Sequence, residues 1–277
     1  MKCLNKYKSS IYGFVDYDIL KKEYLNGKSL RQICIEYGVA RGGFVRHLKQ
    51  DGIEILGNNK NQTPRHILKC NEDFFEVIDS EDKAYIMGFF LADGSFIKNG
   101  IKFDQNIDDV GILYYIKKSI QTESEVKTYN SKITDNYVSR PMCRLLISYI
   151  KLREDLLNKG FNTDKTYSFN KIECPSYLWA DFIRGYLDGD GSIIYCDKSF
   201  SINITIKNKD TTYYIKEKTK EYLDIDFNVR YDTNKDCYTL YISNYKNAKK
   251  FNTLIYHPNY VFCLERKHDK LKKILGN

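Results

Sequence analysis

The chain has 277 residues, of which 42% are hydrophobic and 29% are charged, and it contains only 16 glycines and 4 prolines. This composition predicts a folded globular protein of one large domain or two modest ones, and it excludes a disordered or collagen-like chain. The net charge is +8, and most of it lies near the N-terminus: residues 1–70 hold 13 lysines and arginines against 6 acidic residues, while the remaining 207 residues hold 31 against 30.

The basic N-terminal part indicates a polyanionic partner or ordinary solubility charge, and charge alone does not separate the two. Eight cysteines are scattered at positions 3, 34, 70, 143, 174, 196, 237 and 263, without a C-x-x-C pair or a histidine at ligand spacing. We therefore expect no zinc site and reduced thiols in an intracellular, cytoplasmic protein. The first residues, MKCLNKYKSS, are too polar for a signal peptide, and the longest mostly apolar run, residues 84–92, is too short to cross a membrane.

Residues 1–56 predict a small all-α module of three helices, at 17–25, at 30–37 and from residue 41 onward. Ser29 is the expected N-cap of the second helix, and a short turn with a glycine separates this helix from the third. The third helix is basic, and the side chains expected on its outside are Arg41, Arg46, His47 and Lys49. This layout is that of a helix-turn-helix DNA-binding module, with a generic three-helix bundle as the alternative. The pair Gly42-Gly43 counts against the third helix, because each glycine costs about 1 kcal/mol inside a helix.

A polar linker is expected at residues 57–72, followed by two similar halves at 73–170 and 171–277. In the first half the expected elements are a helix at 82–92, a hairpin around Asn99-Gly100, a helix at 108–121, a hairpin at 125–148 and a helix at 149–159. In the second half they are a helix at 177–189, strands at 191–196 and 199–207, a helix at 210–223, a hairpin at 226–243, a helix at 245–255 and a basic tail helix at 265–275. Both halves have the order αββαββα, which predicts a duplicated α+β domain with pseudo-two-fold symmetry, suited to a two-fold target such as duplex DNA.

Each half contains nearly the same octapeptide, GFFLADGS at 88–95 and GYLDGDGS at 185–192. On a helix, residues four apart lie on one face, and in both copies such a pair is small. The small residues are Gly88 and Ala92 in the first copy and Gly185 and Gly189 in the second. Small residues at this spacing flatten a helix face, so we expect the two motif helices to pack closely against each other.

Asp93 and Asp190 end the two motif helices, and each is followed by a glycine, Gly94 or Gly191, which we expect in the left-handed conformation of a helix end. If the helices pack together, the two carboxylates emerge at the same end of the pair. That arrangement is electrostatically poor, because each carboxylate opposes the helix dipole and the two repel each other. A divalent cation shared by both carboxylates, such as Mg²⁺, explains the pair better than two solvated helix ends do.

The extended motifs YIMGFFLADGS and FIRGYLDGDGS resemble the two motifs of single-chain LAGLIDADG homing endonucleases. The segments LLNKGFNTDKTYSFNKIECP and FNTLIYHPNYVFCLERKHDKL also resemble this family, so that the likeness covers roughly residues 75–277. The resemblance implies an α+β saddle of two four-stranded antiparallel sheets that grips DNA. It also implies a site-specific endonuclease of a mobile genetic element. Such an enzyme is a monomer that cuts both strands of a long, asymmetric target with Mg²⁺ or Mn²⁺.

The resemblance also assigns roles by position in the motifs. The residues assigned in this way are Asp93 and Asp190 as metal-binding catalytic acids helped by the carbonyl groups of Ala92 and Gly189, Gln105 as the group that orients the attacking water, and Lys165 and Lys267 as bases that position solvent or stabilise charge on the phosphate.

Two positions depart from symmetry. Leu91 stands in the first motif where the second has Asp188, at a position that we regard as variable. Gln105 has no clear counterpart in the second half, where either Ile206 or Lys207 takes its place depending on where a gap is set. The two strand cleavages are then unequal in rate, or the two halves share the positioning of water unequally.

The strand SINITIK, residues 201–207, alternates polar and apolar side chains at period two. Any strand with one face in solvent shows this alternation. On the saddle that the resemblance implies, the residues facing bases or phosphates are Ser201, Asn203, Thr205, Lys207 and Arg230.

Other functions remain open at this point. An intein is disfavoured, because the chain starts with Met and ends in ILGN, so a free-standing or intron-encoded protein is expected. The N-terminal module resembles accessory DNA-binding modules that some phage and mobile-element nucleases carry. The main alternative to an endonuclease is a non-cleaving nucleic-acid binder on the same scaffold. It could be an intron maturase that binds its own intron RNA, or a transcription regulator.

Overall fold

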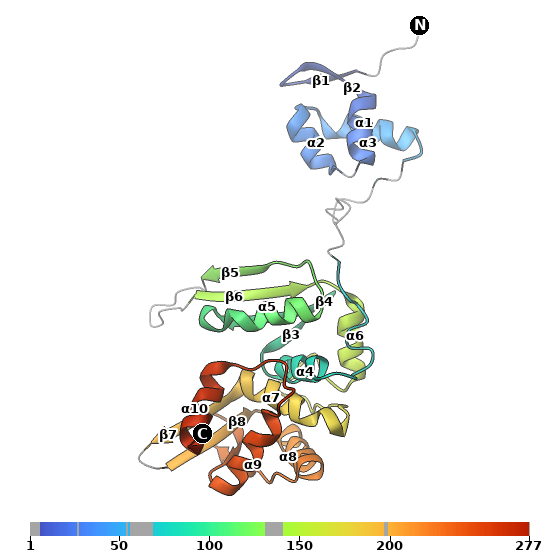
Figure 1. Ribbon diagram of the computed structural model, residues 1–277. Coiled ribbons are helices and arrows are strands. Elements are labelled where there is room, and N and C mark those ends of the chain that lie inside the picture. The colour runs from blue at the N-terminus through green and yellow to red at the C-terminus, as the bar shows by residue number, and fades with distance from the viewer. Residues whose placement is uncertain are drawn as a thin grey trace. The chain divides into compact units, whose positions relative to one another are not determined.

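The computed structural model of the chain describes residues 6–26, 28–53, 55, 69–130, 141–196 and 199–276. The chain divides into two compact units, Met1–Leu68 and Lys69–Asn277 (Figure 1). Residues 57–68 of the expected linker lie outside the described residues, and residues 69–72 belong to the larger unit. None of the helices in the described ranges is long and apolar enough to cross a membrane.

The smaller unit is not purely helical, so the all-α expectation for it is wrong. It opens with an antiparallel hairpin of strands β1 (Lys6–Ser9) and β2 (Gly13–Asp16), and helices α1 (Tyr17–Leu25), α2 (Leu30–Tyr37) and α3 (Arg41–Gln50) follow. The helix positions agree with the sequence pattern. Each strand has only four residues, which is too short for the alternation of side chains to stand out in a sequence.

Local chemistry explains the helix boundaries of the smaller unit. Ser29 forms a capping box with Gln32, as two orphan N–H groups at the start of α2 require, and Gly38 ends α2 in the left-handed conformation. Both glycines of the Gly42-Gly43 pair lie inside α3. The close approach of Tyr7 explains the second one, because the Tyr7 hydroxyl donates to the Gly43 carbonyl at 3.2 Å and a Cβ there would lie 3.2 Å from the tyrosine ring.

The first half of the larger unit contains helix α4 (Glu81–Asp93), strands β3 (Gly94–Ile97) and β4 (Gly100–Asn106), a 3-10 turn (Ile107–Asp109), helix α5 (Val110–Ser119), strands β5 (Val126–Asn130) and β6 (Pro141–Ile147), and helix α6 (Ile150–Asn158). Its strands form an antiparallel sheet in the order β3-β4-β6-β5. The turn of the second expected hairpin, residues 131–140, lies outside the described residues.

The second half repeats this order with a 3-10 turn (Ser176–Leu178), helix α7 (Trp179–Asp190), strands β7 (Gly191–Cys196) and β8 (Ser199–Ile206), helix α8 (Lys209–Leu223), strands β9 (Asn228–Asp232) and β10 (Cys237–Ile242), and helices α9 (Tyr245–Ile255) and α10 (Glu265–Leu275). Its antiparallel sheet has the order β7-β8-β10-β9, equivalent to that of the first half. The expected fold, two four-stranded antiparallel sheets in a duplicated α+β unit, is confirmed, and the helix boundaries of this unit agree with the sequence pattern to within two residues.

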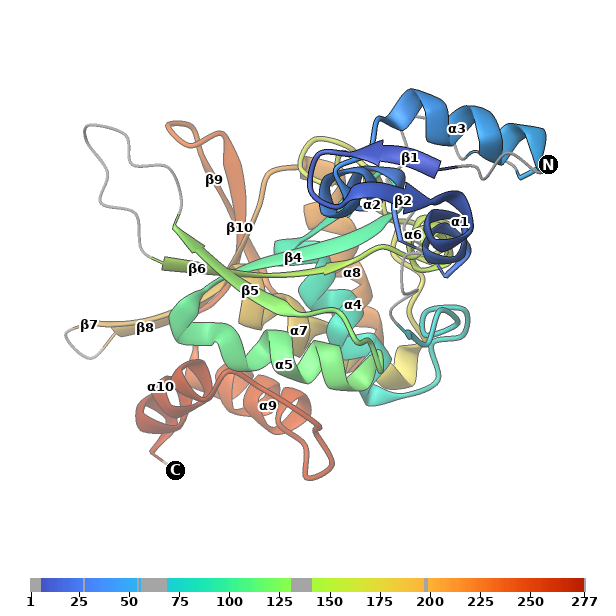
Figure 2. The ribbon, with the colours of Figure 1, turned by 90° about the horizontal axis from the view of Figure 1, so that it is seen from above.

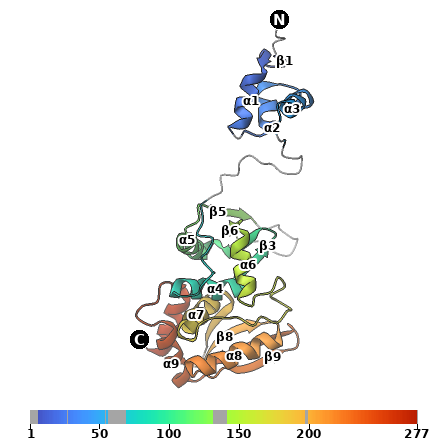
Figure 3. The same cartoon turned by 90° about the vertical axis from the view of Figure 1, so that its right-hand side faces the viewer.

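One hydrophobic core runs through both halves. Each sheet turns its apolar side chains, such as Ile101 and Phe103 of β4 and Ile202 and Ile204 of β8, toward the helices. Helices α4 and α7 lie side by side between the two halves (Figure 3). The motif helices are therefore the centre of the larger unit, and the opposite face of each sheet is left for polar side chains.

Candidate active site

The two motif helices touch through their glycines, as their spacing predicts. A Cβ added at Gly88 would lie 1.9 Å from the carbonyl oxygen of Phe182, and one added at Gly185 would lie 2.0 Å from that of Tyr85. Real Cβ atoms do not approach backbone oxygens so closely, so both positions require glycine. Backbone contact of this kind fixes the helices relative to each other and fixes where they end.

The helix ends bring the two motif aspartates together. An ideal Cβ at Gly189, the residue before Asp190, would lie 2.2 Å from the Cβ of Ala92 and 3.1 Å from Oδ2 of Asp93. Burial, with the charge of Asp93 beside it, raises the pKa of Asp190 to about 6. Two carboxylates thus share one partly desolvated space, although unfavourable charge interactions accompany that arrangement.

Gly94 and Gly191 do not have the expected left-handed conformation. Their φ angles are −74° and −79°, because a strand begins directly where each motif helix ends. Glycine is needed for another reason, since a Cβ at Gly94 would lie 2.1 Å from the ring of Phe90 and one at Gly191 would lie 2.3 Å from the carbonyl oxygen of Leu187. Each glycine lets the chain turn back along its own helix.

Gln105 binds the first aspartate directly. It lies on the helix-facing side of β4, is buried, and donates from Nε2 to Oδ2 of Asp93 at 2.5 Å. Burial raises the pKa of Asp93, and the hydrogen bond from Gln105 opposes that rise. The amide therefore holds the carboxylate in one orientation and favours its charged form.

The sheet register decides which residue corresponds to Gln105. The glycine that follows each motif aspartate pairs with Phe103 in one sheet and with Ile204 in the other. Two residues further on, the counterpart of Gln105 is Ile206, whereas Lys207 follows the end of β8 and is exposed. Asp190 accordingly has no amide partner among the described residues, and the two carboxylates have unequal surroundings.

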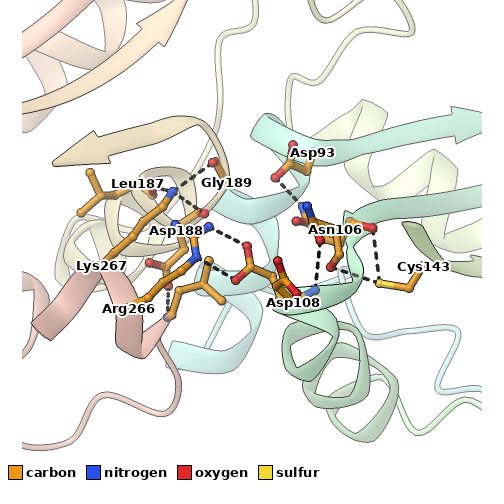
Figure 4. A network of polar contacts seen from close by, with 12 residues as sticks. Asp93, Asn106, Asp108, Cys143, Leu187, Asp188, Gly189, Arg266 and Lys267 are labelled. Carbon is orange, nitrogen blue, oxygen red and sulfur yellow. Dashed lines mark hydrogen bonds and ion pairs between the residues drawn. The ribbon is translucent and has the colours of Figure 1, made fainter. Parts of the chain in front are cut away.

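Two lysines, the half-buried Lys165 and the buried Lys267, close the ends of the motif helices in equivalent ways. Lys165, in the segment between the halves, donates from Nζ to the carbonyls of Phe90 and Leu91 at 2.5 and 3.0 Å. Lys267 of α10 donates to Leu187, at 2.7 Å, and to the next two carbonyls at 2.7 and 3.1 Å (Figure 4). Such contacts satisfy the orphan carbonyls and oppose the negative end of each helix dipole.

Burial lowers the pKa of both lysines to about 8, and nearby carboxylates limit the fall. Next to Lys267, Arg266 forms an ion pair with Asp109 of the first half at 2.5 Å. This pair holds the start of α10 against the first half, while Lys267 caps a helix of the second half. The lysine position therefore depends on the packing of both halves.

Asp188 is a buried residue whose importance the sequence did not indicate. Its Oδ2 accepts hydrogen bonds from the Tyr85 hydroxyl at 2.7 Å and from the Leu264 N–H at 2.9 Å. Burial raises its pKa to about 6, against the effect of these hydrogen bonds. It joins both motif helices to the segment that leads into α10. The sequence signal was that Leu91 stands at the equivalent position of the first motif. A single sequence does not distinguish a variable position from a structural anchor.

On the second sheet, the five residues expected to face DNA do not form one exposed set. Asn203 is buried at 5% exposure, accepts from the Ser201 hydroxyl at 2.7 Å and points its amide toward the Ser192 carbonyl at 3.5 Å. Neighbouring polar groups of β7 and β8 take up its hydrogen bonds, and its contact with a ligand stays a prediction. Thr205 and Arg230 are exposed, and so is Lys207, which follows the end of β8.

In the smaller unit, Arg41, Arg46 and Lys49 are exposed on α3, as expected. His47 is half-buried rather than fully exposed. Its ring packs edge-on against Tyr7 and Tyr17, at centroid distances of 5.4 and 5.5 Å, and its Nδ1 is hydrogen-bonded to the Tyr7 hydroxyl. The sequence could not show this contact, because it depends on the hairpin that folds over the helix.

Part of the second half matches a known family of domains. Residues 179–256 match the family model described as a LAGLIDADG-like domain. The chain is 29% identical over 181 residues to a DNA polymerase of Acanthamoeba polyphaga mimivirus, covering 61% of this chain and 10% of that protein. It is 26% identical over 140 residues to a histidine–tRNA ligase of Metallosphaera sedula, covering 50% of this chain and 32% of that protein. The chain thus spans about a tenth and a third of the two curated relatives.

The fold is also similar to that of the homing endonuclease I-WcaI bound to its DNA recognition sequence. The TM-score is 0.53 at 13% sequence identity, and the match covers 80% of this chain and 97% of the other. At that identity the likeness concerns the fold alone. The second half therefore contains a LAGLIDADG-like domain, and the larger unit, with two matched motif helices and two equivalent sheets, has a fold similar to that of the homing endonuclease I-WcaI.

Proposed function

We propose that this protein is a site-specific endonuclease that hydrolyses both strands of double-stranded DNA at one composite site. The observation that carries the proposal is the meeting of Asp93 and Asp190 at the end of the α4–α7 pair, each contributed by one half. A protein that used these helices only for packing would have no reason to place two carboxylates where they repel each other and oppose two helix dipoles.

The donor set fits a hard divalent cation. Asp93 and Asp190 supply carboxylate oxygens, and the carbonyls of Ala92 and Gly189 lie in the same two helix turns. No cluster of three or more His, Cys, Asp or Glu side chains suited to a metal exists within the described ranges. Mg²⁺ and Mn²⁺ suit such a site because Mg²⁺ keeps several waters and binds through one or two carboxylates plus phosphate oxygens. When bound, the cation would supply Lewis-acid activation of the phosphate and of water.

The remaining residues prepare the site around the carboxylates. Gln105 fixes the orientation of Asp93, and its carbonyl oxygen is an acceptor for the attacking water. Lys165 and Lys267, with pKa values near 8, are mostly protonated at neutral pH and place two positive charges where negative charge builds up on a phosphate. Two positive charges in a partly desolvated space favour the transition state over the ground state.

Duplex DNA is the proposed partner of a monomer that acts inside the cell. I-WcaI, whose fold this chain shares, was solved bound to its DNA recognition sequence. The two halves of this chain differ in sequence, so they are suited to a long and asymmetric target. The exposed Arg41, Arg46 and Lys49 of α3 support an accessory DNA contact by the smaller unit.

Cleavage, rather than binding, tests the proposal. Purified protein is incubated with host genomic DNA and with a randomised duplex library, in Mg²⁺ or in EDTA, and new double-strand ends are mapped by sequencing. Asp93→Asn and Asp190→Asn are expected to lose Mg²⁺-dependent cleavage. Asp226→Asn, which changes an exposed carboxylate that pairs with Lys216, makes the same charge change and is expected to cut normally.

Absence of double-strand ends from the wild-type protein, despite sequence-selective retention of DNA or of intron RNA, contradicts the endonuclease. It would assign the scaffold to a non-cleaving binder, such as an intron maturase or a transcription regulator. Equal cutting by the wild type and both aspartate variants would show that the breaks come from a contaminating nuclease.

A further inference from the structure

The uncovered face of the first sheet carries a row of charged residues that the proposed catalysis does not use. Strands β4, β6 and β5 run side by side (Figure 2), and Asp104, Arg144 and Lys127 lie directly opposite one another across them. Their neighbours Phe103 and Leu145 are fully buried against the helices. Because side chains alternate along a strand, the charged row points away from the core.

Arg144 is held in place by its neighbours. Its Nε donates to Oδ1 of Asp104 at 2.5 Å, and its guanidinium lies 4.7 Å from the centre of the Tyr129 ring. The Tyr129 hydroxyl and the Lys102 ammonium also donate to Asp104, at 3.0 and 2.9 Å. Burial pushes the pKa of Asp104 up, but these hydrogen bonds together hold it below its usual value. Asp104 is therefore a fixed anion that orients the arginine.

Among the described residues, these contacts leave part of the guanidinium available. Arg144 has five N–H donors, of which Nε–H is engaged by Asp104 and one Nη2 hydrogen lies 3.5 Å (N to O) from the Tyr129 hydroxyl. Its side chain is 38% exposed, while that of Asp104 is 22% exposed. The free donors belong to a planar group whose orientation is already set, so little side-chain entropy is lost when they bind an acceptor pair.

The second sheet lacks this arrangement at equivalent positions. The registers of the two sheets place Thr205 where the first has Asp104, Thr239 where it has Arg144, and Arg230 where it has Lys127. A row of charge in one half is thus a row of two hydroxyls and one exposed arginine in the other. The two uncovered faces therefore offer different chemistry to a ligand that lies across both.

We propose that Arg144, oriented by Asp104 and Tyr129, reads a guanine in the half of the DNA target that the first sheet contacts. The inference rests on the proposed function, and it adds a specificity-determining residue to it. A guanine presents the O6 and N7 acceptors in the major groove that match the fork of an arginine. A phosphate contact fits less well, because Asp104 beside the guanidinium repels a second anion. No equivalent guanine contact exists in the other half-site.

Binding selection in EDTA tests this without any cleavage. The full chain is incubated with a randomised duplex library, and retained DNA is sequenced for the wild type, Arg144→Ala, Arg144→Lys and Asp104→Asn. The wild type is expected to require a G·C pair at one position of one half-site. Arg144→Ala and Arg144→Lys are expected to reduce that preference roughly 5- to 150-fold while the rest of the motif persists. Asp104→Asn is expected to weaken it less.

Lys220→Ala is the control, since it removes an exposed positive charge from helix α8 rather than from a sheet. It is expected to leave the guanine position unchanged. Uniform weakening over all sequences by Arg144→Ala, with a shallower salt dependence, would identify a phosphate contact and overturn the inference. An unchanged guanine preference in Arg144→Lys would also overturn the inference. This variant keeps the positive charge and serves as the test if Arg144→Ala does not fold. A wild type that selects no sequence at all overturns the proposed function as well.

Discussion

Lys165 and Lys267 cap the last turns of the two motif helices with the same pattern of carbonyl contacts, although one lies between the halves and the other near the C-terminus. Beyond these caps the symmetry of the site ends. Asp93 is held by an amide, whereas the residue equivalent to Gln105 next to Asp190 is the apolar Ile206. One half can orient a carboxylate and a water through a side-chain amide, and the other half lacks that group.

Gln105→Leu is expected to slow cleavage of one DNA strand more than the other, by about 10- to 100-fold, because the Asp93 carboxylate loses the contact that orients it. A supercoiled plasmid bearing the target should then pass through a nicked circle that accumulates before linear DNA appears. Ile206→Leu, an apolar exchange at the equivalent position, should leave the wild-type time course intact. Equal slowing of both strands by Gln105→Leu would mean that the amide serves the two halves alike.

His268 makes stability depend on pH in a direction that can be worked out. Its ring stacks on Tyr256 at 3.7 Å, and burial, together with the charge of Lys272, lowers its pKa. In the unfolded chain the histidine has a pKa near 6.5, so the unfolded state binds more protons below that pH. The free energy of unfolding must then fall as pH decreases through the window below about 6.5.

His268→Phe keeps an aromatic ring against Tyr256 and removes the proton-binding group. We expect this variant to lose less stability than the wild type between pH 7.5 and pH 5.5, as measured by urea unfolding at each pH. The comparison isolates the histidine, because the raised pKa values of Asp188 and Asp190 act equally in both proteins. An identical loss in the two proteins would show that His268 titrates in the folded state as it does in the unfolded chain.

At the scale of elements, the α4–α7 contact decides whether a site exists. Backbone groups of the two helices touch at Gly88 and Gly185, and the aspartates follow five residues later in each helix. A small shift between the helices would separate the carboxylates, because nothing else in the described part of the chain fixes their spacing as closely. The helix pair is therefore the rigid scaffold that holds the two carboxylates at a fixed spacing.

Gly88→Ala is expected to destabilise the larger unit by about 1–3 kcal/mol or more, because the added methyl group would overlap the Phe182 carbonyl. It should also lower cleavage more than the loss of folded protein explains, since the helices must move apart. Gly111→Ala in α5 is the control, as a Cβ there has no atom within 4 Å. Thermal unfolding and cleavage rates measure both effects, and equal results for the two variants would contradict this account of the interface.

At the scale of the whole molecule, the chain consists of two units with unlike charge. The unit Met1–Leu68 contains most of the net positive charge of the sequence, while the larger unit contains both motif helices and both sheets. Charge of this kind adds phosphate contacts without adding chemistry. The division predicts that affinity and catalysis can be separated experimentally.

A protein consisting of residues 69–277 is expected to fold and to cleave the target in Mg²⁺, but with weaker binding and a shallower decrease of affinity with salt than the full chain. Binding at several salt concentrations and cleavage at saturating protein measure the two properties separately. The triple variant Arg41→Ala, Arg46→Ala, Lys49→Ala in the full chain should reproduce part of the salt effect. An unchanged salt dependence after truncation would exclude a DNA contact by the smaller unit.

Much of this structure could be predicted from the sequence because its signals are local or repeated. Helix caps, glycine-containing turns and the period of apolar residues depend on near neighbours in the chain. The duplicated octapeptide shows which residues of the two halves correspond. The misses all depend on contacts between distant segments. The hairpin over α3 partly covers His47, and the turn back along its own helix, rather than a left-handed φ, explains Gly94.

The sequence by itself thus determined the order of elements in the larger unit, the duplication and the two acids, since each of these is a property of residues close together in the chain or of a repeated motif. Only the tertiary structure decided that Ile206 takes the position equivalent to Gln105, that Asp188 is an anchor, and that Asp104 orients Arg144 on the uncovered face. The physical reason is that strand register and cross-half packing set which side chains meet. A shift of one residue in strand register would turn Ile206, Asp104 or Arg144 to the opposite face of its sheet.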